Sequence, residues 1–482
     1  MLLRRTKIVA TLGPATDRPG VLEQVCKAGA DVVRINFSHG QAEEHSERAK
    51  MVRQVREKTR RHVAILADLQ GPKIRIARFK ETKIELETDA PFVIDVSLDP
   101  EAGDQNQVGC SYPALATDLK PGNVLMLDDG RVVLGVDKIE GPRILCHVMV
   151  GGELSNNKGL NLQGGGLSAP ALSDKDRKDI VTAAQIQADY VAVSFPRCAA
   201  DIHEARRLLR AAGSDAGLIA KIERAEALEV IEEIIEASDG IMVARGDLGV
   251  EIGEAVLPAV QKNLIDLARK MDTAVIIATQ MMESMIYNPL PTRAEVFDVA
   301  NAIFDGTDAV MLSAETAAGK YPVKAVEAMR RICLETEKQP GVKVQPADND
   351  NLHFSRIDEA IAKSAMYVAN HTETKAIIAL TESGATPIWM SRLNSSIPIF
   401  AMTPHVKTCR KVNLLRGVHP LTFKVDTLSH AVLNKAAIEE LEARGMLSKG
   451  DMVILTKGDL TGVQGGTNAM KIIRVGEELI PE

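Results

Sequence analysis

Short apolar runs recur along the chain, and most of them end in a polar or charged residue before a helical stretch begins. Runs that are apolar throughout are typical of strands buried on both faces of a parallel sheet. The amphipathic stretches between them, such as residues 43–59 and 229–238, match the helices that connect such strands. Eight of these units predict an α/β fold with a closed (β/α)8 TIM barrel. We place its strands at residues 7–12, 32–37, 63–69, 190–195, 218–223, 240–244, 274–279 and 309–313.

The alternation of strand-like runs and helical stretches is interrupted between the third and fourth predicted strands, where residues 71–170 contain few helical patterns. Alternating stretches at 83–89 and 131–139, with an Asp-Gly turn at Asp129, predict an inserted all-β domain. Glycine and proline at both ends of the insertion are typical of hinges. A domain inserted after a barrel strand lies at the barrel mouth, so we expect it to serve as a lid.

A polar segment at 341–351 has no apolar period and is interpreted as a linker. Beyond it, helical stretches alternate with strand-like runs at 375–381, 397–403, 450–456 and 468–475, which predicts a smaller open α/β sheet. The predicted domains are therefore a barrel at 1–70 plus 171–345, a β-rich lid at 71–170, and a C-terminal α/β regulatory domain at 346–482.

Composition narrows the classes of function. The 482 residues include 58 Lys and Arg against 65 Asp and Glu, a net charge of −7, and only 3% aromatic residues. Without a basic block or stacking aromatics we expect no nucleic-acid partner. No apolar run is long enough to span a bilayer, so we expect no membrane partner. The six cysteines lack metal or redox spacing, which favours reduced thiols and a cytoplasmic location.

Polar side chains gather at the ends of the predicted strands, where barrel active sites lie. Arg34, Asn36 and Ser38 alternate along the second strand and share one face. Lys221 and Glu223 share a face of the fifth strand in the same way. A salt-bridged strand end is the alternative for the first group, but a row of three polar residues favours a site. For the second group, a simple ion pair explains the pattern as well as a site does.

The sixth strand continues into Arg245, Gly246 and Asp247. Asp247 and Glu223 come from neighbouring strands, and two hard carboxylates with room for water favour Mg²⁺. An aspartate that only caps the following helix is the simpler alternative. The predicted mouth collects cations and carboxylates together, which suits a phosphorylated, carboxylated substrate bridged by a divalent metal. These groups are Arg34, Arg75, Lys221, Asp68, Glu223 and Asp247, with the hydroxyl of Thr279 on the seventh strand.

Seven motifs, in this order, resemble those of the pyruvate kinase family: VRINFSHG, DLQGPKIR, PALSDKD, AKIER, ARGDLG, ATQMMESM and LSAETAAGKYP. The resemblance covers most of the chain. It implies transfer of a phosphoryl group from phosphoenolpyruvate to ADP, which gives pyruvate and ATP in the last step of glycolysis. It also implies a homotetramer.

The resemblance implies a role for each matching residue. Lys221, Arg34 and Thr279 would be catalytic, and Glu223 and Asp247 would hold Mg²⁺, for which Mn²⁺ could substitute. Phosphoenolpyruvate would be bound by Arg34, Lys221, Ala244, Arg245, Gly246, Asp247 and Thr279. The nucleotide would be bound by Asn36, His39, Arg75 and Lys175.

One position departs from many members of the family. Those members have Glu where this chain has Lys73, and they use K⁺ held by residues matching Asn36, Ser38, Asp68 and the carbonyl of Leu69. Members with Lys there resemble K⁺-independent enzymes. We therefore expect the ammonium of Lys73 to replace K⁺, and we expect activity without that ion.

The C-terminal domain contains a second candidate site before an apolar helix. Hydroxyls, a glycine and a proline near a helix start are typical of a phosphate-binding loop, although a capped loop without a ligand is also compatible. By resemblance this is the allosteric sugar-phosphate site. Because residues 458–469 contain no Lys, Arg or Trp, we expect a monophosphate activator, either a sugar phosphate or AMP. The loop comprises Thr381, Glu382, Ser383, Gly384, Ala385 and Thr386.

Two other functions remain open from the sequence. A lyase or mutase on a related phosphoenolpyruvate-binding barrel would share the magnesium carboxylates. A non-catalytic sugar-phosphate sensor could keep the same fold, but we would then expect Lys221, Glu223 or Asp247 to be lost, and all three are present.

Overall fold

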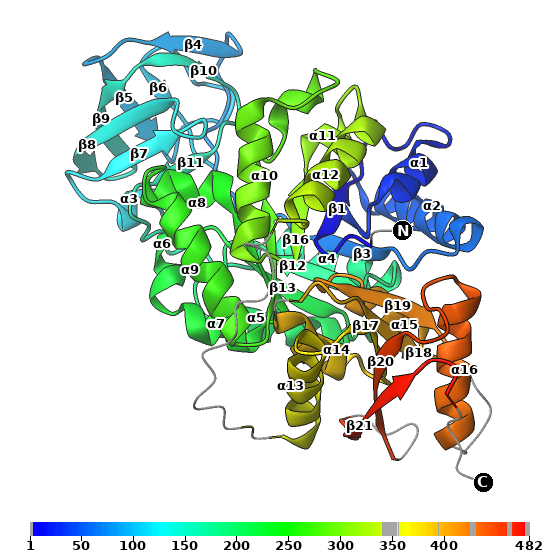
Figure 1. Ribbon diagram of the computed structural model, residues 1–482. Coiled ribbons are helices and arrows are strands. Elements are labelled where there is room, and N and C mark those ends of the chain that lie inside the picture. The colour runs from blue at the N-terminus through cyan, green and yellow to red at the C-terminus, as the bar shows by residue number, and fades with distance from the viewer. Residues whose placement is uncertain are drawn as a thin grey trace. The chain divides into compact units, whose positions relative to one another are not determined.

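Figure 1 shows a computed structural model of the chain, which describes residues 3–339, 354, 356–393, 395–424, 430–459 and 465–477. The predicted linker at 341–351 lies outside the described residues, as does part of the late loop, residues 460–464.

Eight parallel strands form a closed barrel in the order β1-β16-β15-β14-β13-β12-β3-β2. The prediction of a barrel is confirmed, and each predicted strand corresponds to one observed strand. Their side chains are buried nearly throughout, because one face packs inside the barrel and the other packs under the helices. The strands are β1 (Lys7–Thr11), β2 (Val32–Asn36), β3 (Ala64–Asp68), β12 (Tyr190–Val193), β13 (Gly217–Ile222), β14 (Gly240–Ala244), β15 (Ala274–Ala278) and β16 (Ala309–Leu312).

Helices alternate with these strands along the chain. Their ends follow local sequence, as α10 illustrates: Thr292 and Glu295 form a capping box at its start, and Gly306 ends it with a φ of 95°. The helices are α1 (Val21–Ala28), α2 (Ala42–Thr59), α4 (Asp174–Gln185), α5 (Ala199–Ala211), α6 (Ala225–Glu229), α7 (Ile231–Ala237), α8 (Arg245–Ile252), α9 (Leu257–Lys270), η1 (Glu283–Ile286), α10 (Arg293–Asp305), α11 (Ala314–Ala317) and α12 (Pro322–Thr336).

The insertion is rich in β-structure, as predicted, and contains one short helix, α3 (Leu115–Asp118). Six strands pair in the order β11-β7-β8-β9-β5-β6, and β10 pairs with β4. Asp129 and Gly130 have φ of 57° and 85° in the connection between the antiparallel strands β7 and β8. The strands are β4 (Lys83–Leu86), β5 (Pro91–Asp95), β6 (Gln107–Val108), β7 (Val124–Leu127), β8 (Val132–Glu140), β9 (Arg143–Val150), β10 (Gly152–Ser155) and β11 (Leu160–Leu162).

The C-terminal sheet has five strands in the order β19-β18-β17-β20-β21. Four were predicted, and β19 (Val418–Thr422) was missed because His419 and Pro420 interrupt its apolar pattern. Proline is tolerated there because β19 is an edge strand. The other elements are β17 (Thr374–Leu380), β18 (Ile399–Thr403), β20 (Met452–Gly458), β21 (Thr467–Arg474), α13 (Ile357–Asn370), α14 (Ala385–Arg392), α15 (Val406–Val412) and α16 (His430–Ala443).

The chain divides into two compact units. The first comprises residues 1–67, 185–191 and 265–482, and the second comprises residues 68–184 and 192–264. The first therefore contains the C-terminal sheet together with five barrel strands, β1, β2, β15, β16 and most of β3. The second contains the β-rich insertion with β13 and β14.

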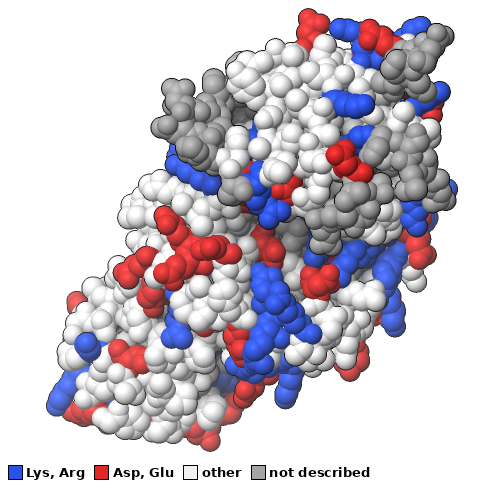
Figure 2. Space-filling view, turned by 90° about the horizontal axis from the view of Figure 1, so that it is seen from below, with Lys and Arg blue, Asp and Glu red and all other residues white. Residues whose placement is uncertain are grey.

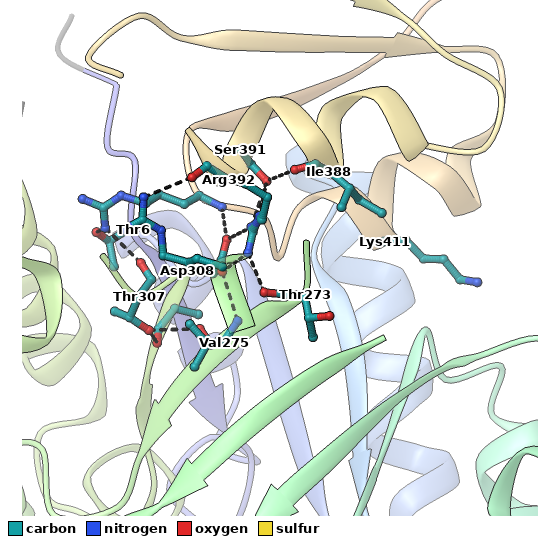
Figure 3. Close-up of polar contacts among 12 residues, drawn as sticks. Thr6, Thr273, Val275, Thr307, Asp308, Ile388, Ser391, Arg392 and Lys411 are labelled. Atoms are coloured by element: carbon teal, nitrogen blue, oxygen red, sulfur yellow. Dashed lines mark hydrogen bonds and ion pairs between the residues drawn. The ribbon is translucent and has the colours of Figure 1, made fainter. Parts of the chain in front are cut away.

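A buried charge network ties α14 to barrel strands within the first unit (Figure 3). Asp308, just before β16, accepts hydrogen bonds from the backbone N–H groups of Val275 (3.0 Å) and Arg416 (2.9 Å). Its carboxylate also pairs with both terminal nitrogens of Arg392, the last residue of α14. The Arg392 Nη1 atom donates in addition to the carbonyl of Thr273 at 2.6 Å. Every charge in this network meets several partners.

No helix in the described part of the chain is long and apolar enough to cross a membrane. The face seen in Figure 2 bears side chains of both charge signs, in keeping with the small net charge.

Candidate active site

Lys221 lies at the end of β13 in the second unit, with 12% of its side chain exposed. Its ammonium nitrogen is 2.9 Å from Oε1 of Glu223 and 3.5 Å from Oδ1 of Asp68. It also donates a hydrogen bond to the hydroxyl of Ser194 at 2.7 Å. The structure thus brings Lys221 and Glu223, predicted from the end of the fifth strand, together with Asp68 from the end of the third, in a buried cluster of one cation and two carboxylates.

Glu223 is the most constrained carboxylate of this cluster. Its other oxygen accepts the backbone N–H of Phe195 at 2.9 Å, and only 2% of the residue is exposed. Burial raises the pKa of Glu223, and the negative charges of Asp247 and Asp68 raise it further, whereas Lys221 lowers it. The loss of solvation on burial, more than any single neighbouring charge, therefore opposes the ionised form of Glu223.

Ser194 connects the cluster to Leu69, and sequence reasoning did not identify it. Its hydroxyl accepts from Lys221 and donates to the carbonyl of Leu69 at 2.8 Å. A hydroxyl near the end of the fourth apolar run, residues 190–195, was the available signal, because the other strand ends had been searched in the same way. Ser194 fixes the direction of the ammonium group.

Asp247 lies in the first turn of α8, which begins directly after β14. Its Oδ1 atom is 3.2 Å from the ammonium nitrogen of Lys73, whose side chain is 28% exposed. Ala244, Arg245 and Gly246 form the junction between strand and helix, and a helix N-terminus attracts anions. The pairing of Lys73 with Asp247 was not predicted, because 174 residues separate the two in sequence.

The donor set suits a hard divalent cation. In the described residues, no group of three or more His, Cys, Asp or Glu side chains is arranged to hold a metal ion by itself. Two carboxylates, Glu223 and Asp247, with the remaining positions open to water and substrate oxygens, match the way proteins bind Mg²⁺. The nearby carboxylate of Asp68, which with Asp247 raises the pKa of Glu223, fits the same ion.

Two residues of the predicted nucleotide site lie in the second unit. Arg75 donates to the carbonyl of Asn157 at 2.9 Å, and its backbone N–H donates to Ser111. Lys175, in the first turn of α4, pairs with Asp179 at 2.5 Å and has 45% of its side chain exposed. Both side chains are on the surface of this unit, where a ligand could reach them.

The other predicted residues of the mouth lie in the first unit. Arg34 donates to the hydroxyl of Thr11 on the adjacent β1 at 3.2 Å. The side-chain oxygen of Asn36 accepts the backbone N–H of Ser38 at 3.0 Å, and the backbone N–H of His39 donates to the carbonyl of Asn36. These bonds shape the turn after β2.

Thr279 has a φ of 67°, which is strained for a β-branched residue. Its hydroxyl donates to the carbonyl of Ala278 at 2.6 Å. Strain of this kind is common at functional sites and is compatible with the role predicted for Thr279.

The predicted effector loop borders a cavity of about 330 Å³ in the C-terminal domain. Gly384, at a φ of 91°, precedes α14, and its N–H donates to the hydroxyl of Thr381 at 2.9 Å. Glu382 pairs with His405 at 2.6 Å. Five loop residues line the cavity: Thr381, Glu382, Ser383, Ala385 and Thr386.

Two lysines outside the loop also line this cavity, Lys424 and Lys457. Lys457 is on β20 and only 4% exposed. Burial and the neighbouring Lys471 lower its pKa. Sequence reasoning missed both lysines because it searched only the loops. Across the cavity, Thr386 and Thr467 share a hydrogen bond of 2.8 Å.

Comparison with known proteins gives matches along nearly the whole chain. The family model described as "Pyruvate kinase, barrel domain" matches residues 3–326, and "Pyruvate kinase, alpha/beta domain" matches residues 359–473. Pyruvate kinase II of Salmonella typhimurium is 54% identical over 98% of this chain and 99% of the relative. Pyruvate kinases of Haemophilus influenzae and Staphylococcus aureus are 51% and 41% identical, over 99% and 81% of their own lengths.

Proposed function

The chain belongs to the pyruvate kinase family of phosphotransferases, and we propose that it transfers the phosphoryl group of phosphoenolpyruvate to ADP, giving pyruvate and ATP in the last step of glycolysis. The observation that supports this most directly is the buried cluster of Lys221, Glu223 and Asp68. Such transfer has a loose transition state that needs fixed positive charge and in-line positioning more than covalent chemistry.

We assign to Lys221 the neutralisation of the phosphoryl group during transfer. Ser194, Glu223 and Asp68 hold its ammonium group in one direction, so little reorganisation is needed when charge develops. We assign the grip on the phosphate to Arg34. The backbone at Ala244–Asp247 and the hydroxyl of Thr279 would hold the substrate carboxylate.

Glu223 and Asp247 would hold Mg²⁺, or Mn²⁺ in its place. When bound, the metal supplies positive charge that stabilises the phosphate oxygens and the enolate. The chain must then protonate that enolate, and we assign to Thr279 the relay of a proton through water. Nucleotide contacts are assigned to Asn36, His39, Arg75 and Lys175.

A coupled assay for pyruvate, with phosphoenolpyruvate, ADP and Mg²⁺, tests the reaction. We expect turnover in the unmodified protein and its loss in Lys221→Met. The matched control is Lys178→Met on α4, because Lys178 is exposed. Pyruvate release without ATP would indicate a lyase, and rearranged substrate would indicate a mutase. No pyruvate at all, with Lys221→Met indistinguishable from the unmodified protein, would indicate a sensor.

We propose that the reaction does not need K⁺. The ammonium of Lys73 is fixed near Asp247, and the carbonyl of Leu69 already accepts a hydrogen bond from Ser194. The first observation supplies a fixed positive charge beside a proposed metal ligand, and the second gives the Leu69 carbonyl a partner without a monovalent ion. The sequence predicted that Asn36, Ser38, Asp68 and Leu69 would hold that ion.

Rates in K⁺ and in tetramethylammonium at equal ionic strength test this proposal. We expect similar rates for the unmodified protein and a marked K⁺ requirement in Lys73→Glu. Lys80→Glu, an exposed change in the same inserted domain, is the control. A hundredfold loss without K⁺ in the unmodified protein would contradict the proposal.

We propose that the cavity in the C-terminal domain binds a phosphorylated activator with one phosphate group, either a sugar phosphate or AMP. Thr381 and Ser383 provide hydroxyls, and Lys457 provides a buried positive charge. Rate curves against phosphoenolpyruvate, with a panel of monophosphates, identify the activator. Lys457→Gln should weaken activation about tenfold, whereas Lys471→Gln, on the adjacent β21, should not. Activation by fructose 1,6-bisphosphate alone would contradict the proposal.

We also propose, from family membership, a cytoplasmic homotetramer with the three domains bounded as predicted. Light scattering should give about four times the chain mass of 52.1 kDa. A monomer at assay concentration would contradict the tetramer.

A further inference from the structure

Residues 223–226, directly after β13, contact two different parts of the second unit. Each of these four residues has a separate partner. Glu223 belongs to the Lys221 cluster, and the backbone N–H of Ala225 donates to Oε2 of Glu251 on α8 at 2.8 Å. Arg224 and Glu226 instead bind the segment that returns from the inserted domain, residues 164–169, which we call the return segment.

The return segment is held by its backbone. Arg224 Nη1 donates to the carbonyl of Leu167 at 2.9 Å, and its Nη2 atom donates to that of Ala169 at 3.5 Å. The N–H of Gly166 donates to Oε1 of Glu226. Because the contacts go to backbone atoms, they set the position of the chain irrespective of its side chains.

Glycine is required where the return segment meets Glu226. Gly165 has a φ of 77°, and a Cβ atom added there would lie 2.5 Å from Oε2 of Glu226. A side chain at this position would therefore displace the carboxylate as well as strain the backbone. The absence of a side chain at Gly165 thus lets the backbone of the return segment lie against the carboxylate of Glu226.

Helix α8 contacts both the return segment and residues 223–226 through Glu251. The carbonyl of Glu251 accepts the N–H of Gly164 at 3.0 Å, while its carboxylate accepts that of Ala225. Asp247 lies one turn earlier on α8, so both proposed metal ligands adjoin groups that contact the return segment. The guanidinium of Arg224 also lies over the ring of Phe195, whose N–H donates to Glu223. Arg224 is 4% exposed and Glu251 is 7% exposed.

We propose that Arg224 and Glu226 are positioning residues for phosphoryl transfer, which tie the return segment of the inserted domain to the carboxylate of Glu223. The proposal rests on the proposed function. A movement of the inserted domain shifts residues 164–169. Residues 223–226 pass that shift to the carboxylate of Glu223, a proposed metal ligand. Conversely, a metal bound at Glu223 and Asp247 restricts the movement of the return segment. It thereby restricts the movement of Arg75, which belongs to the inserted domain.

Kinetics of Glu226→Ala and Glu226→Gln in the full chain test this coupling. Gln keeps an oxygen that accepts the Gly166 N–H, so we expect it to retain most activity. Ala removes the acceptor, and we expect KM for ADP to rise about tenfold with a smaller change in KM for phosphoenolpyruvate, because Arg75 is on the inserted domain. Glu229→Ala, at the other end of α6, is the matched control. Arg224→Lys, which keeps the positive charge and one donor nitrogen in place of two, should be milder than Arg224→Met.

Two measurements without turnover separate this inference from the proposed reaction. Amide exchange at residues 164–169 should accelerate about tenfold in Glu226→Ala, and Mn²⁺ affinity, read by electron paramagnetic resonance, should fall at least threefold. Faster exchange with unchanged KM and unchanged Mn²⁺ affinity would overturn the coupling. Equal losses of activity in Glu226→Ala and Glu226→Gln, accompanied by a lower melting temperature in both, would also overturn the coupling. An unmodified protein that makes no pyruvate would refute the reaction, while the Mn²⁺ comparison would still decide the coupling.

Discussion

Two buried charge clusters in this protein differ in how their charges are balanced. Around Asp308, one carboxylate meets the guanidinium of Arg392 and two backbone N–H groups. Around Lys221, one ammonium group meets two carboxylates, and a third carboxylate still raises the pKa of Glu223. The first cluster surrounds a single carboxylate with hydrogen-bond donors, whereas the second gathers several carboxylates around one ammonium group.

This difference separates a structural role from a functional one. A buried ion pair is tolerated when further hydrogen bonds offset the loss of solvation, as they do for Asp308. A cluster in which several carboxylates surround one cation at strand ends is suited to a ligand that brings further positive charge. We infer that the second cluster is maintained for Mg²⁺ and the phosphoryl group.

Glu223→Gln should give the largest effect. We expect a loss of activity of about a thousandfold or more, because a proposed metal ligand loses its charge. The free energy of unfolding should stay nearly constant or rise, because the substitution removes a charge whose burial is the main cause of its raised pKa, and Lys221 keeps Asp68 and Ser194 as partners. Pyruvate release and urea unfolding measure the two quantities, with Glu229→Gln as the control. A strongly destabilised variant that retains full activity would reverse the assignment.

Asp308→Asn should produce the opposite pattern. The guanidinium of Arg392 would remain buried without its carboxylate, and the free energy of unfolding should fall by about 3–5 kcal/mol. The folded fraction should keep a nearly normal kcat. Urea unfolding measures the loss, and adding Arg392→Met should recover part of it, since the unpaired charge then disappears. If the double variant is no more stable than the single one, charge balance is not the cause.

Glu251→Gln should change how stability depends on pH. Burial and the charges of Glu226 and Asp247 raise the pKa of Glu251 to about 7, although Ala225 N–H and Arg224 oppose the shift. The folded state therefore holds this proton more tightly than the unfolded state, whose pKa stays near 4.5. The free energy of unfolding should fall between these two pH values, by at most about 3 kcal/mol. Urea unfolding from pH 4 to 8 should show a flatter profile in the variant, and an unchanged slope would contradict this.

Lys27→Ala should give the smallest effect. Lys27 pairs with Glu23 at 2.6 Å on α1, but 60% of its side chain is exposed. Exposed pairs contribute little, because water and salt screen them. Thermal unfolding should detect no change, and a clear drop in melting temperature would show that burial does not separate strong from weak pairs here.

The elements most easily predicted were those buried on both faces. The run at 274–278, Ala-Val-Ile-Ile-Ala, is buried at every position in β15. The strand β19 was missed because its edge position leaves Val418 as its only fully buried residue. For the site, the alternation of Lys221 and Glu223 was enough to place both on one face. Ser194 could have been found by searching the end of the fourth strand in the same way, whereas the pairing of Lys73 with Asp247 could not, because the two residues are 174 positions apart.

The order of apolar and polar residues alone determined the barrel, the β-rich insertion and which side chains share a strand face, because these depend on local periodicity. Tertiary structure alone decided which distant charges meet, as it did for Asp308 with Arg392, 84 residues apart, and for Glu226 with the return segment. Such pairings form only after the strands have assembled into the barrel and brought distant residues together. Burial then raises the cost of an isolated charge, and the newly formed pairing offsets that cost.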